Sequence, residues 1–304
     1  MKKISFIICF IVFITFCINA NALSLSAVSA ILIDAKTGEC LYEKNADRKM
    51  PMASTTKIMT AICTMENINS NVPITVKEEA TKIEGSSIYL SAGEKITVKE
   101  LLCGMLLNSG NDAATALAVE IGGTVEGFAN LMNKTAKKIG AKSSNFKNPS
   151  GLYDNEHYTT ARDLAKISAY ALENPLISWI VSSKELKISG GEKAEVRYLK
   201  NHNRLLWQYD GCMGVKTGYT KKCGRCLVSS AKRGEMELIA VTLNAPDDWR
   251  DHTALFDYGF SLQNDGQKNS ESENENNTLK EVFSLLFSRA VNFMFTAGQN
   301  LCII

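Results

Sequence analysis

Apolar and polar positions along this chain follow two different periods, and each period predicts its own kind of element. Short apolar runs bounded by turn residues are typical of strands. Such runs lie over residues 28–34 and 39–42, and again near residues 214, 228 and 240. The first two flank a Lys-Thr-Gly turn and predict a β-hairpin, and the five together predict one antiparallel sheet.

The middle of the chain, from about residue 55 to residue 180, has a helical period instead. Its apolar residues recur at intervals of three and four positions, the spacing of one face of an α-helix. The predicted helices cover residues 99–107, 112–121, 124–138 and 160–172, with a closing helix over 253–260. Residues 23–263 are therefore predicted to form one α/β (α+β) domain, with an antiparallel sheet flanked by helices and a helical subdomain.

The first residues have the features of a secretory signal peptide. Met1-Lys2-Lys3 is a basic start, residues 4–18 form an apolar run, and Ala20-Asn21-Ala22 is a cleavage site of small residues. The apolar run is short for a membrane span. We expect residues 1–22 to be removed and the protein to be exported, to the extracytoplasmic face of the cell membrane or the cell wall.

After the domain the composition changes. Residues 264–278 are polar and of low complexity, which predicts a solvated linker. Over residues 279–304, apolar side chains recur at helical spacing opposite a polar face, which predicts an amphipathic helix. We expect this helix to lie on the membrane surface, and the alternative is a helix that docks back onto the domain.

Charge and cysteine content narrow the classes of function. A net charge of +2 and 45% hydrophobic residues describe an ordinary globular protein and give no sign of nucleic-acid binding. Cys223-Gly224-Arg225-Cys226 has the spacing of a redox motif or of half a zinc site. The chain has three His residues and no second ligand pair, so we favour a coincidence within a hairpin and expect no metal or cofactor.

Ser54-Thr55-Thr56-Lys57 is the first of three motifs that can supply parts of an acyl-transfer site. A serine becomes a nucleophile when a neighbouring base takes its proton, and a lysine with a lowered pKa can be that base. The segment from Pro51 onward is predicted to start a helix, so Ser54 and Lys57 share a face. Free backbone N–H groups at a helix start can stabilise an oxyanion. Alone, the motif also fits an ordinary N-cap serine and a solvated lysine.

The second and third motifs offer a hydroxyl, an amide and a second cation. Ser109-Gly110-Asn111 ends an apolar helix and presents its side chains from a tight turn. In Lys216-Thr217-Gly218, the lysine and the hydroxyl can bind a carboxylate, and Gly218 lets a ligand approach the strand edge. Alone, these motifs also fit a helical corner and a solvated edge-strand lysine.

Taken together and in this order, the three motifs resemble the S-x-x-K, S-D-N and K-T-G set of penicillin-binding proteins and class A β-lactamases, with Gly110 in place of the aspartate. Ser-Gly-Asn is similar to the low-molecular-mass branch, the serine-type D-alanyl-D-alanine carboxypeptidases of peptidase family S11. The stretches 148–152, 157–165 and 201–206 resemble the same branch. The resemblance covers about residues 27–262 and implies a transpeptidase/β-lactamase-like fold.

The resemblance implies a role for each residue of the motifs. Ser54 would be the acylated nucleophile, Lys57 its general base and Ser109 a proton relay. The substrate-binding residues would be Asn111, Lys216, Thr217, Gly218 and Arg250.

Two assignments stay open in the sequence. Arg250 would help to hold the terminal carboxylate, yet a surface ion pair with Asp247 or Asp248 explains it equally well. One oxyanion donor would be the backbone N–H of Ser54, and the second would lie near Cys212 or Tyr219.

The function implied by the resemblance is removal of the terminal D-alanine from peptidoglycan stem pentapeptides, with β-lactams as inhibitors. Such carboxypeptidases usually carry a β-rich domain before their terminal amphipathic helix, and residues 264–278 are too few to form one.

Two other functions share the motifs. A β-lactamase would need a glutamate that activates the deacylating water, and we interpret Glu126 as a surface residue instead. A cell-wall-binding scaffold would need no catalysis, although all the chemical groups are present.

Overall fold

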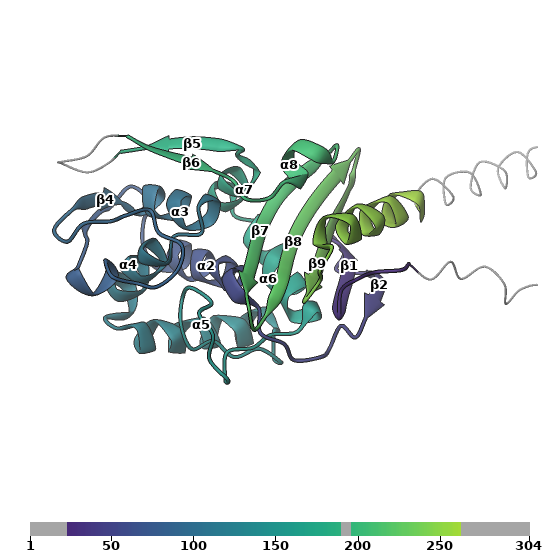
Figure 1. Ribbon diagram of the computed structural model, residues 1–304, viewed down its shortest axis with the longest axis horizontal. Helices are drawn as coiled ribbons and strands as arrows, with labels where there is room; N and C mark the ends of the chain where they lie inside the picture. Colours follow the sequence, from purple (N-terminus) through teal and green to yellow (C-terminus); the bar gives the residue numbers. More distant parts are fainter. Residues whose placement is uncertain (1–22, 190–195, 263–304) are drawn as a thin grey trace, which may run out of the picture. The chain divides into compact units, whose positions relative to one another are not determined.

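The computed structural model describes residues 23–189 and 196–262. Its main feature is a five-stranded sheet with the order β2-β1-β9-β8-β7, in which every neighbouring pair is antiparallel (Figure 1). The strands are β1 (Ser29–Asp34), β2 (Cys40–Lys44), β7 (Cys212–Thr220), β8 (Gly224–Arg233) and β9 (Met236–Leu243). The prediction of one antiparallel sheet from these five segments is confirmed.

Helices dominate the segment between β2 and β7. They are α2 (Lys57–Asn67), α3 (Val98–Leu107), α4 (Asn111–Gly122), α5 (Val125–Ile139), α6 (Ala161–Leu172), α7 (Pro175–Ser182) and α8 (Leu205–Gln208), with the 3-10 turns η1 (Ala53–Thr56) and η2 (Glu78–Ala80). The four helices predicted between residues 99 and 172 are α3 to α6, and they begin and end within one residue of the predicted positions.

The last described helix covers residues 248–262 and therefore begins before the predicted start at residue 253. The chain divides into two compact units, the first ending at Phe256 and the second beginning at Asp257. Only residues 257–262 of the second unit are described, and they continue the helix.

The sequence pattern does not predict several short elements. β3 (Pro73–Thr75) pairs with β4 (Lys95–Thr97), and β5 (Glu185–Ile188) pairs with β6 (Arg197–Lys200), in two small antiparallel sheets. Each of these strands has a single fully buried side chain. They therefore lack the apolar run that signals a strand in a sequence.

Both faces of strands β1, β8 and β9 are buried over most of their length, which explains the unbroken apolar runs in these strands. Alternate side chains of a strand point to opposite faces. In β9, Ile239 and Val241 join the core shared with the helices, and α6 and α7 pack on the sheet. Thr242, the residue after Val241, points to the opposite face and is buried, and its Oγ1 lies 3.0 Å from Nε2 of His252, on the helix over 248–262.

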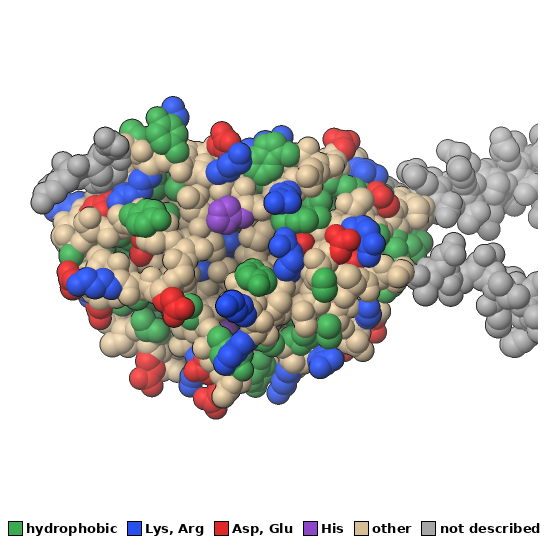
Figure 2. All heavy atoms as spheres, in the orientation of Figure 1, with side chains coloured by type: hydrophobic (Ala, Val, Ile, Leu, Met, Phe, Trp, Pro, Cys, Tyr) green, Lys and Arg blue, Asp and Glu red, His purple; other side chains and the backbone are tan. Residues whose placement is uncertain are grey.

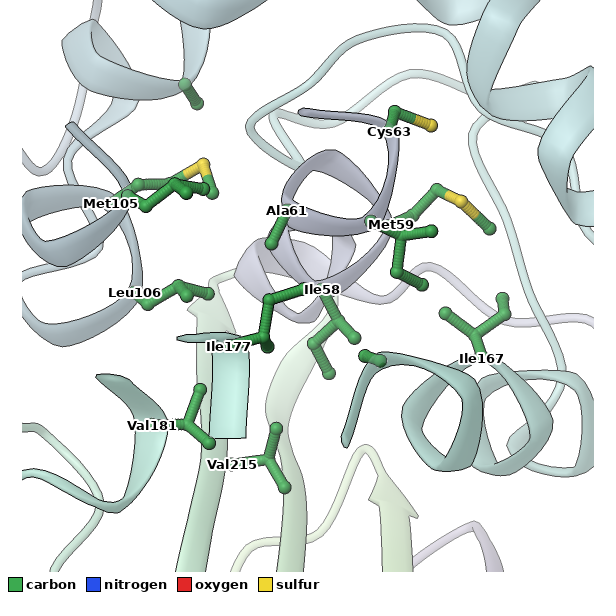
Figure 3. Close-up of a cluster of buried hydrophobic side chains, with 14 of the residues drawn as sticks. Ile58, Met59, Ala61, Cys63, Met105, Leu106, Ile167, Ile177, Val181 and Val215 are labelled. Carbon is green, nitrogen blue, oxygen red and sulfur yellow. The ribbon is translucent and has the colours of Figure 1, made fainter. Parts of the chain in front are cut away.

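Helix α2 lies at the centre of the helical core. Its side chains include Ile58, Met59, Ala61 and Cys63, none more than 1% exposed. Figure 3 shows them among apolar side chains of α3, α6, α7 and β7, namely Met105, Leu106, Ile167, Ile177, Val181 and Val215. Close packing of so many apolar groups fixes the start of α2, and with it Lys57, relative to the sheet.

Three predicted segments lie outside the described residues: the signal peptide over 1–22, the linker over 264–278 and the amphipathic helix over 279–304. They stay predictions. Among the helices of residues 23–189 and 196–262, none combines the length and the apolar character needed to cross a bilayer.

Cys223 and Cys226 are both buried and neither is in a disulfide. Cys223 precedes β8 and Cys226 lies within it, so their spacing follows from the turn between β7 and β8. Within the part of the chain that the structure describes, no cluster of three or more His, Cys, Asp or Glu side chains is arranged to hold a metal ion.

Two buried histidines make the fold sensitive to acid. Burial lowers the pKa of His157 from 6.5 to about 4 and the pKa of His252 from 6.5 to about 3. The unfolded chain therefore binds these protons at a higher pH than the folded protein does. Their contribution to stability is complete above the unfolded pKa and is lost as the pH falls through the folded values.

We expect the free energy of unfolding, measured by urea titration, to decrease by on the order of 2–3 kcal/mol per buried histidine between about pH 7 and pH 4. His252→Gln removes one of the two groups, so its stability should depend less steeply on pH. His202→Gln is the comparison: this histidine is exposed, and although partial burial and the charge of Lys216 also lower its pKa, its replacement should change the slope less. Equal acid slopes for the wild type and His252→Gln would contradict this account.

Candidate active site

Ser54 and Lys57 meet because the chain makes a tight turn just before α2. The sequence predicts one continuous helix here, and the structure has a 3-10 turn over Ala53–Thr56 followed by the α-helix from Lys57. In a 3-10 turn, residues three positions apart are eclipsed. Lys57 Nζ accordingly lies 3.0 Å from Ser54 Oγ, within hydrogen-bonding distance.

The side-chain nitrogen of Lys57 is fully buried and surrounded by oxygen atoms. Besides Ser54 Oγ, Nζ is 2.7 Å from Asn111 Oδ1 and 2.6 Å from the backbone oxygen of Ser150, and it donates to both. The Asn111 amide cannot be turned round, because its Nδ2 donates to the backbone oxygen of Glu84 at 2.6 Å. Two of the three contacts of Lys57 are therefore with groups that only accept hydrogen bonds.

This arrangement orients the lysine as a base. A neutral amine has two N–H bonds and one lone pair. If the two N–H groups point to Asn111 and Ser150, the lone pair faces the hydroxyl of Ser54. Burial lowers the pKa of Lys57 well below 10.5, and the positive charge of Lys216 lowers it further, while Asp112 opposes the shift. The neutral form, which can take a proton from Ser54, is favoured on both counts.

Lys216 lies beneath the cleft surface. Its side chain is buried, its Nζ donates to the backbone oxygen of Thr217 at 3.1 Å, and burial lowers its pKa to about 7. Thr217 and Gly218 lie at the cleft itself. A Cβ at Gly218 would lie 3.0 Å from Ser54 N, so the missing side chain lets β7 approach the turn that carries the nucleophile.

Ser109 occupies the turn between α3 and α4, as predicted. Its φ of +61° places this non-glycine residue in the left-handed region, and its side chain lines the same cleft as Ser54. Such conformations persist where the surrounding structure holds them and are frequent at functional sites.

Asp112 is a structural residue of the site that lies outside the three sequence motifs. Its buried carboxylate accepts hydrogen bonds from Ser87 Oγ at 2.6 Å and from the backbone N–H groups of Ile88 and Leu90 at 3.1 Å. It fixes the loop next to Glu84, whose backbone oxygen in turn orients Asn111. Asp112 directly follows the Ser-Gly-Asn motif, and this position is the one feature of the sequence that points to it.

His157 stabilises the turn η1 through a hydrogen bond to Thr56. The backbone N–H of Lys147 donates to His157 Nδ1 at 3.0 Å, so the ring proton is on Nε2, which donates to Thr56 Oγ1 at 2.8 Å. Thr56 Oγ1 donates onward to the backbone oxygen of Ala53 at 2.8 Å. A Cβ at Gly151 would lie 1.9 Å from that same oxygen, so only glycine fits there.

These residues surround a cleft of about 800 Å³. Ser54, Ser109, Thr217 and Gly218 line it, together with the basic or titratable side chains Lys200, His202, Arg204 and Arg225 and a single carboxylate, Asp248. Figure 2 shows Lys and Arg side chains gathered in the middle of one face, around a histidine. The cleft is therefore suited to an anionic ligand.

Arg250 is not brought to the cleft. Its side chain is 67% exposed and its Nε forms an ion pair with Asp247 Oδ2 at 3.2 Å. Arg225 stands at the cleft instead, with its Nε 2.9 Å from Asp248 Oδ1. The surface ion pair, the second of the two interpretations of Arg250, describes the structure. Glu126 is likewise exposed, at the start of α5.

The structure thus brings together seven of the eight residues named from the sequence. Ser54, Lys57 and Asn111 are in direct contact, Ser109, Thr217 and Gly218 line the same cleft, and Lys216 is buried close enough to act on Lys57.

Comparison with known proteins agrees with this geometry. The sequence profile of the D-alanyl-D-alanine carboxypeptidase family, peptidase S11, matches residues 17–247. The chain is 39% identical over 252 residues to D-alanyl-D-alanine carboxypeptidase DacF of Bacillus subtilis strain 168, covering 80% of this chain and 64% of DacF. It therefore spans less than two thirds of the length of DacF.

Two crystal structures have a similar fold. The Streptomyces K15 DD-transpeptidase superposes with a TM-score of 0.75 at 33% identity, over 78% of this chain and 98% of that one. The D-alanyl-D-alanine carboxypeptidase DacD from Francisella tularensis superposes with a TM-score of 0.73 at 32% identity, over 81% of this chain and 72% of that one. With the sheet, the cleft and the profile match in agreement, this chain belongs to the peptidase S11 family of D-alanyl-D-alanine carboxypeptidases.

Proposed function

We propose that this protein is a serine-type D-alanyl-D-alanine carboxypeptidase that removes the terminal D-alanine from peptidoglycan stem pentapeptides. One observation carries the proposal: a buried lysine amine lies 3.0 Å from a cleft serine, and two acceptors fix its remaining hydrogens. That is the geometry of an activated nucleophile. The names of the relatives and their family support the choice of substrate.

Acylation begins with proton transfer from Ser54 Oγ to neutral Lys57. The serine oxygen attacks the carbonyl carbon of the penultimate D-alanine, and the negative charge collects on the carbonyl oxygen. Backbone N–H groups can stabilise that oxyanion. We assign one to Ser54 and the second to Tyr219, because Tyr219 lines the cleft beside Gly218 and Cys212 does not.

The tetrahedral intermediate then expels the terminal D-alanine. Its amine needs a proton, which Ser109 passes on from Lys57, so that the lysine returns to its neutral form. The products of this step are free D-alanine and an ester of Ser54. Water attacks the ester with Lys57 again taking a proton, which releases the shortened peptide and restores the serine.

The cleft also accounts for the kind of peptide that is bound. A stem peptide ends in a free carboxylate, and three of the side chains that line the cleft are Lys or Arg. Thr217 adds a hydroxyl donor at the strand edge, and Asn111 can position the peptide backbone. β-Lactams carry a comparable carboxylate and acyl group, so we expect them to acylate Ser54.

We further propose that the protein works outside the cytoplasmic membrane. The basic, apolar and small-residue pattern of residues 1–22 supports export, and peptidoglycan is an extracytoplasmic substrate. The amphipathic pattern of residues 279–304 supports attachment to the membrane surface. Separation of cell fractions, with and without residues 279–304, tests both parts.

Replacement of Lys57 by alanine tests the assignment of the base. We expect Lys57→Ala to reduce acylation of Ser54 by at least about 1,000-fold, since general-base catalysis and the hydrogen-bonding partner are lost together. Mass spectrometry after incubation with penicillin, or with diacetyl-Lys-D-Ala-D-Ala, reports the adduct site and D-alanine release. Lys142→Ala, at an exposed position, is the control. Normal labelling of a folded Lys57→Ala protein would refute the role.

The pH dependence of acylation follows from the same lysine. The neutral form of Lys57 is the base, so the acylation rate should rise with pH to a plateau, with a midpoint below the usual lysine pKa of 10.5. Lys216→Gln removes the positive charge that Lys216 carries at and below its own pKa of about 7, which should raise the pKa of Lys57 and move the midpoint to higher pH. Stopped-flow acylation by a chromogenic cephalosporin measures the midpoint. A shift to lower pH in Lys216→Gln would show that the two lysines do not interact in this way.

Stability of the penicilloyl ester separates this function from that of a β-lactamase. Asp248 is the one carboxylate among the described side chains that line the cleft, and it is paired with Arg225. With no free carboxylate there to activate water, the adduct should persist for minutes or longer. We expect intact-mass measurements to show a lasting adduct and nitrocefin to be hydrolysed with a single burst. Continuous rapid turnover of nitrocefin would favour the β-lactamase.

A further inference from the structure

The substrate carboxylate needs a cation that is accessible in the cleft, and the best candidate from the sequence does not provide one. Lys216 is 2% exposed, and its Nζ is hydrogen-bonded to the backbone of Thr217. Lys57 is fully buried and engaged with Ser54, Asn111 and Ser150. Arg250 points away into an ion pair with Asp247. Some other side chain must therefore meet the carboxylate directly.

Arg225 is placed for this task by the sheet. It lies on β8 directly opposite Tyr219 of β7, two residues along the strand from Thr217. Residues two apart on a strand, and residues paired across an antiparallel ladder, project from the same face. Arg225, Tyr219 and Thr217 indeed all line the cleft that contains Ser54.

The guanidinium group of Arg225 is also oriented in advance. Its Nε donates to Asp248 Oδ1 at 2.9 Å, and the Asp248 side chain is only 3% exposed. The indole of Trp249 lies beside the guanidinium, with its ring centre 5.6 Å from Cζ. Both neighbours come from the start of the helix over 248–262. They fix the plane of a group that would otherwise rotate freely.

The contacts with Asp248 and Trp249 leave the two terminal nitrogens of the Arg225 guanidinium free. Arg225 is hydrogen-bonded to a described side chain through Nε alone, so Nη1 and Nη2 remain available, and the side chain is 41% exposed. Two parallel N–H groups form the fork that matches both oxygens of a carboxylate.

The other two cations of the cleft lack such an arrangement. Lys200 and Arg204 flank the loop between β6 and α8, and both are exposed. Lys200 lies near Glu185, at 3.7 Å, and near the ring of Trp207. Neither Lys200 nor Arg204 lies on the strands that carry Thr217 and its partner.

We propose that Arg225, held by Asp248 and Trp249, binds the terminal carboxylate of the substrate together with Thr217 and so selects peptides with a free C-terminus. The inference rests on the proposed carboxypeptidase function, since it names the group that recognises the end of that substrate. Buried Lys216 of β7 then contributes its charge without touching the carboxylate, and Arg225 makes the direct contact with it.

A pair of thioester substrates tests the proposal. Both have the acyl part diacetyl-Lys-D-Ala, and the leaving thiol carries either a free carboxylate or its methyl ester. A thioester reacts readily, so the neutral member remains measurable. We expect Arg225→Ala to lower kcat/KM for the carboxylate substrate by roughly 100-fold, mostly through KM, and to leave kcat/KM for the methyl ester nearly unchanged.

Matched variants complete the experiment. Arg250→Ala should discriminate between the two substrates as the wild type does. Arg225→Lys keeps the charge without the fork and should lie between the wild type and Arg225→Ala. Thermal unfolding shows whether Arg225→Ala folds. If it does not, Arg225→Lys tests the proposal in its place.

Equal losses on both substrates in the folded Arg225 variants would overturn the proposal, because a merely structural role lowers both. Loss of discrimination in Arg250→Ala would overturn it as well. Failure of the proposed function is a separate result: the wild type would then cleave neither thioester and form no ester on Ser54.

Discussion

Burial of the Lys57 amine is the interaction on which the rest of this structure depends. An ammonium ion in the protein interior is unfavourable unless it is paired, and here the charges that act on Lys57 are another lysine, Lys216, and, more weakly, Asp112. These surroundings therefore favour the neutral amine, whose two N–H groups can both be satisfied by Asn111 and Ser150. The lone pair of the amine then faces the hydroxyl of Ser54, 3.0 Å away.

That contact requires groups from three separate parts of the chain. The turn before α2 supplies the serine, the start of α4 supplies Asn111, and the loop near residue 150 supplies a backbone oxygen. Each part is fixed by its own packing or hydrogen bonds: the apolar core around α2, the Glu84 oxygen on Asn111, and the close fit of Gly151 against Ala53. A site assembled in this way is rigid because no single segment can move without breaking contacts to the others.

The two halves of the cleft have different physical tasks. The helical side holds the nucleophile and the buried base, and burial there favours the neutral form of the lysine. The β7–β8 side presents Thr217 and Arg225 to solvent, where a charged substrate end can be captured. Separating the neutral base from the exposed cation allows one cleft to bind an anion and still deprotonate a serine.

The sequence by itself predicted the five strands of the main sheet, helices α3 to α6 and the seven residues that the structure brings together. These features are local: an apolar run, a 3.6-residue period, or a serine three positions before a lysine leaves a mark in consecutive residues. Short elements such as β5 and β6 have no such pattern, because each buries only one side chain.

Only the tertiary structure decided the rest. The contact of Lys57 with the Ser150 backbone oxygen has no side-chain signature, and the clamp of Asp112 and the tautomer of His157 depend on residues far apart in the chain. Whether Arg250 or Arg225 stands at the cleft also depends on the folded chain: Arg250, in the first turn of the helix over 248–262, is in a surface ion pair, and Arg225 of β8 lines the cleft. Proximity to the site is a property of the folded chain, and no spacing in the sequence encodes it.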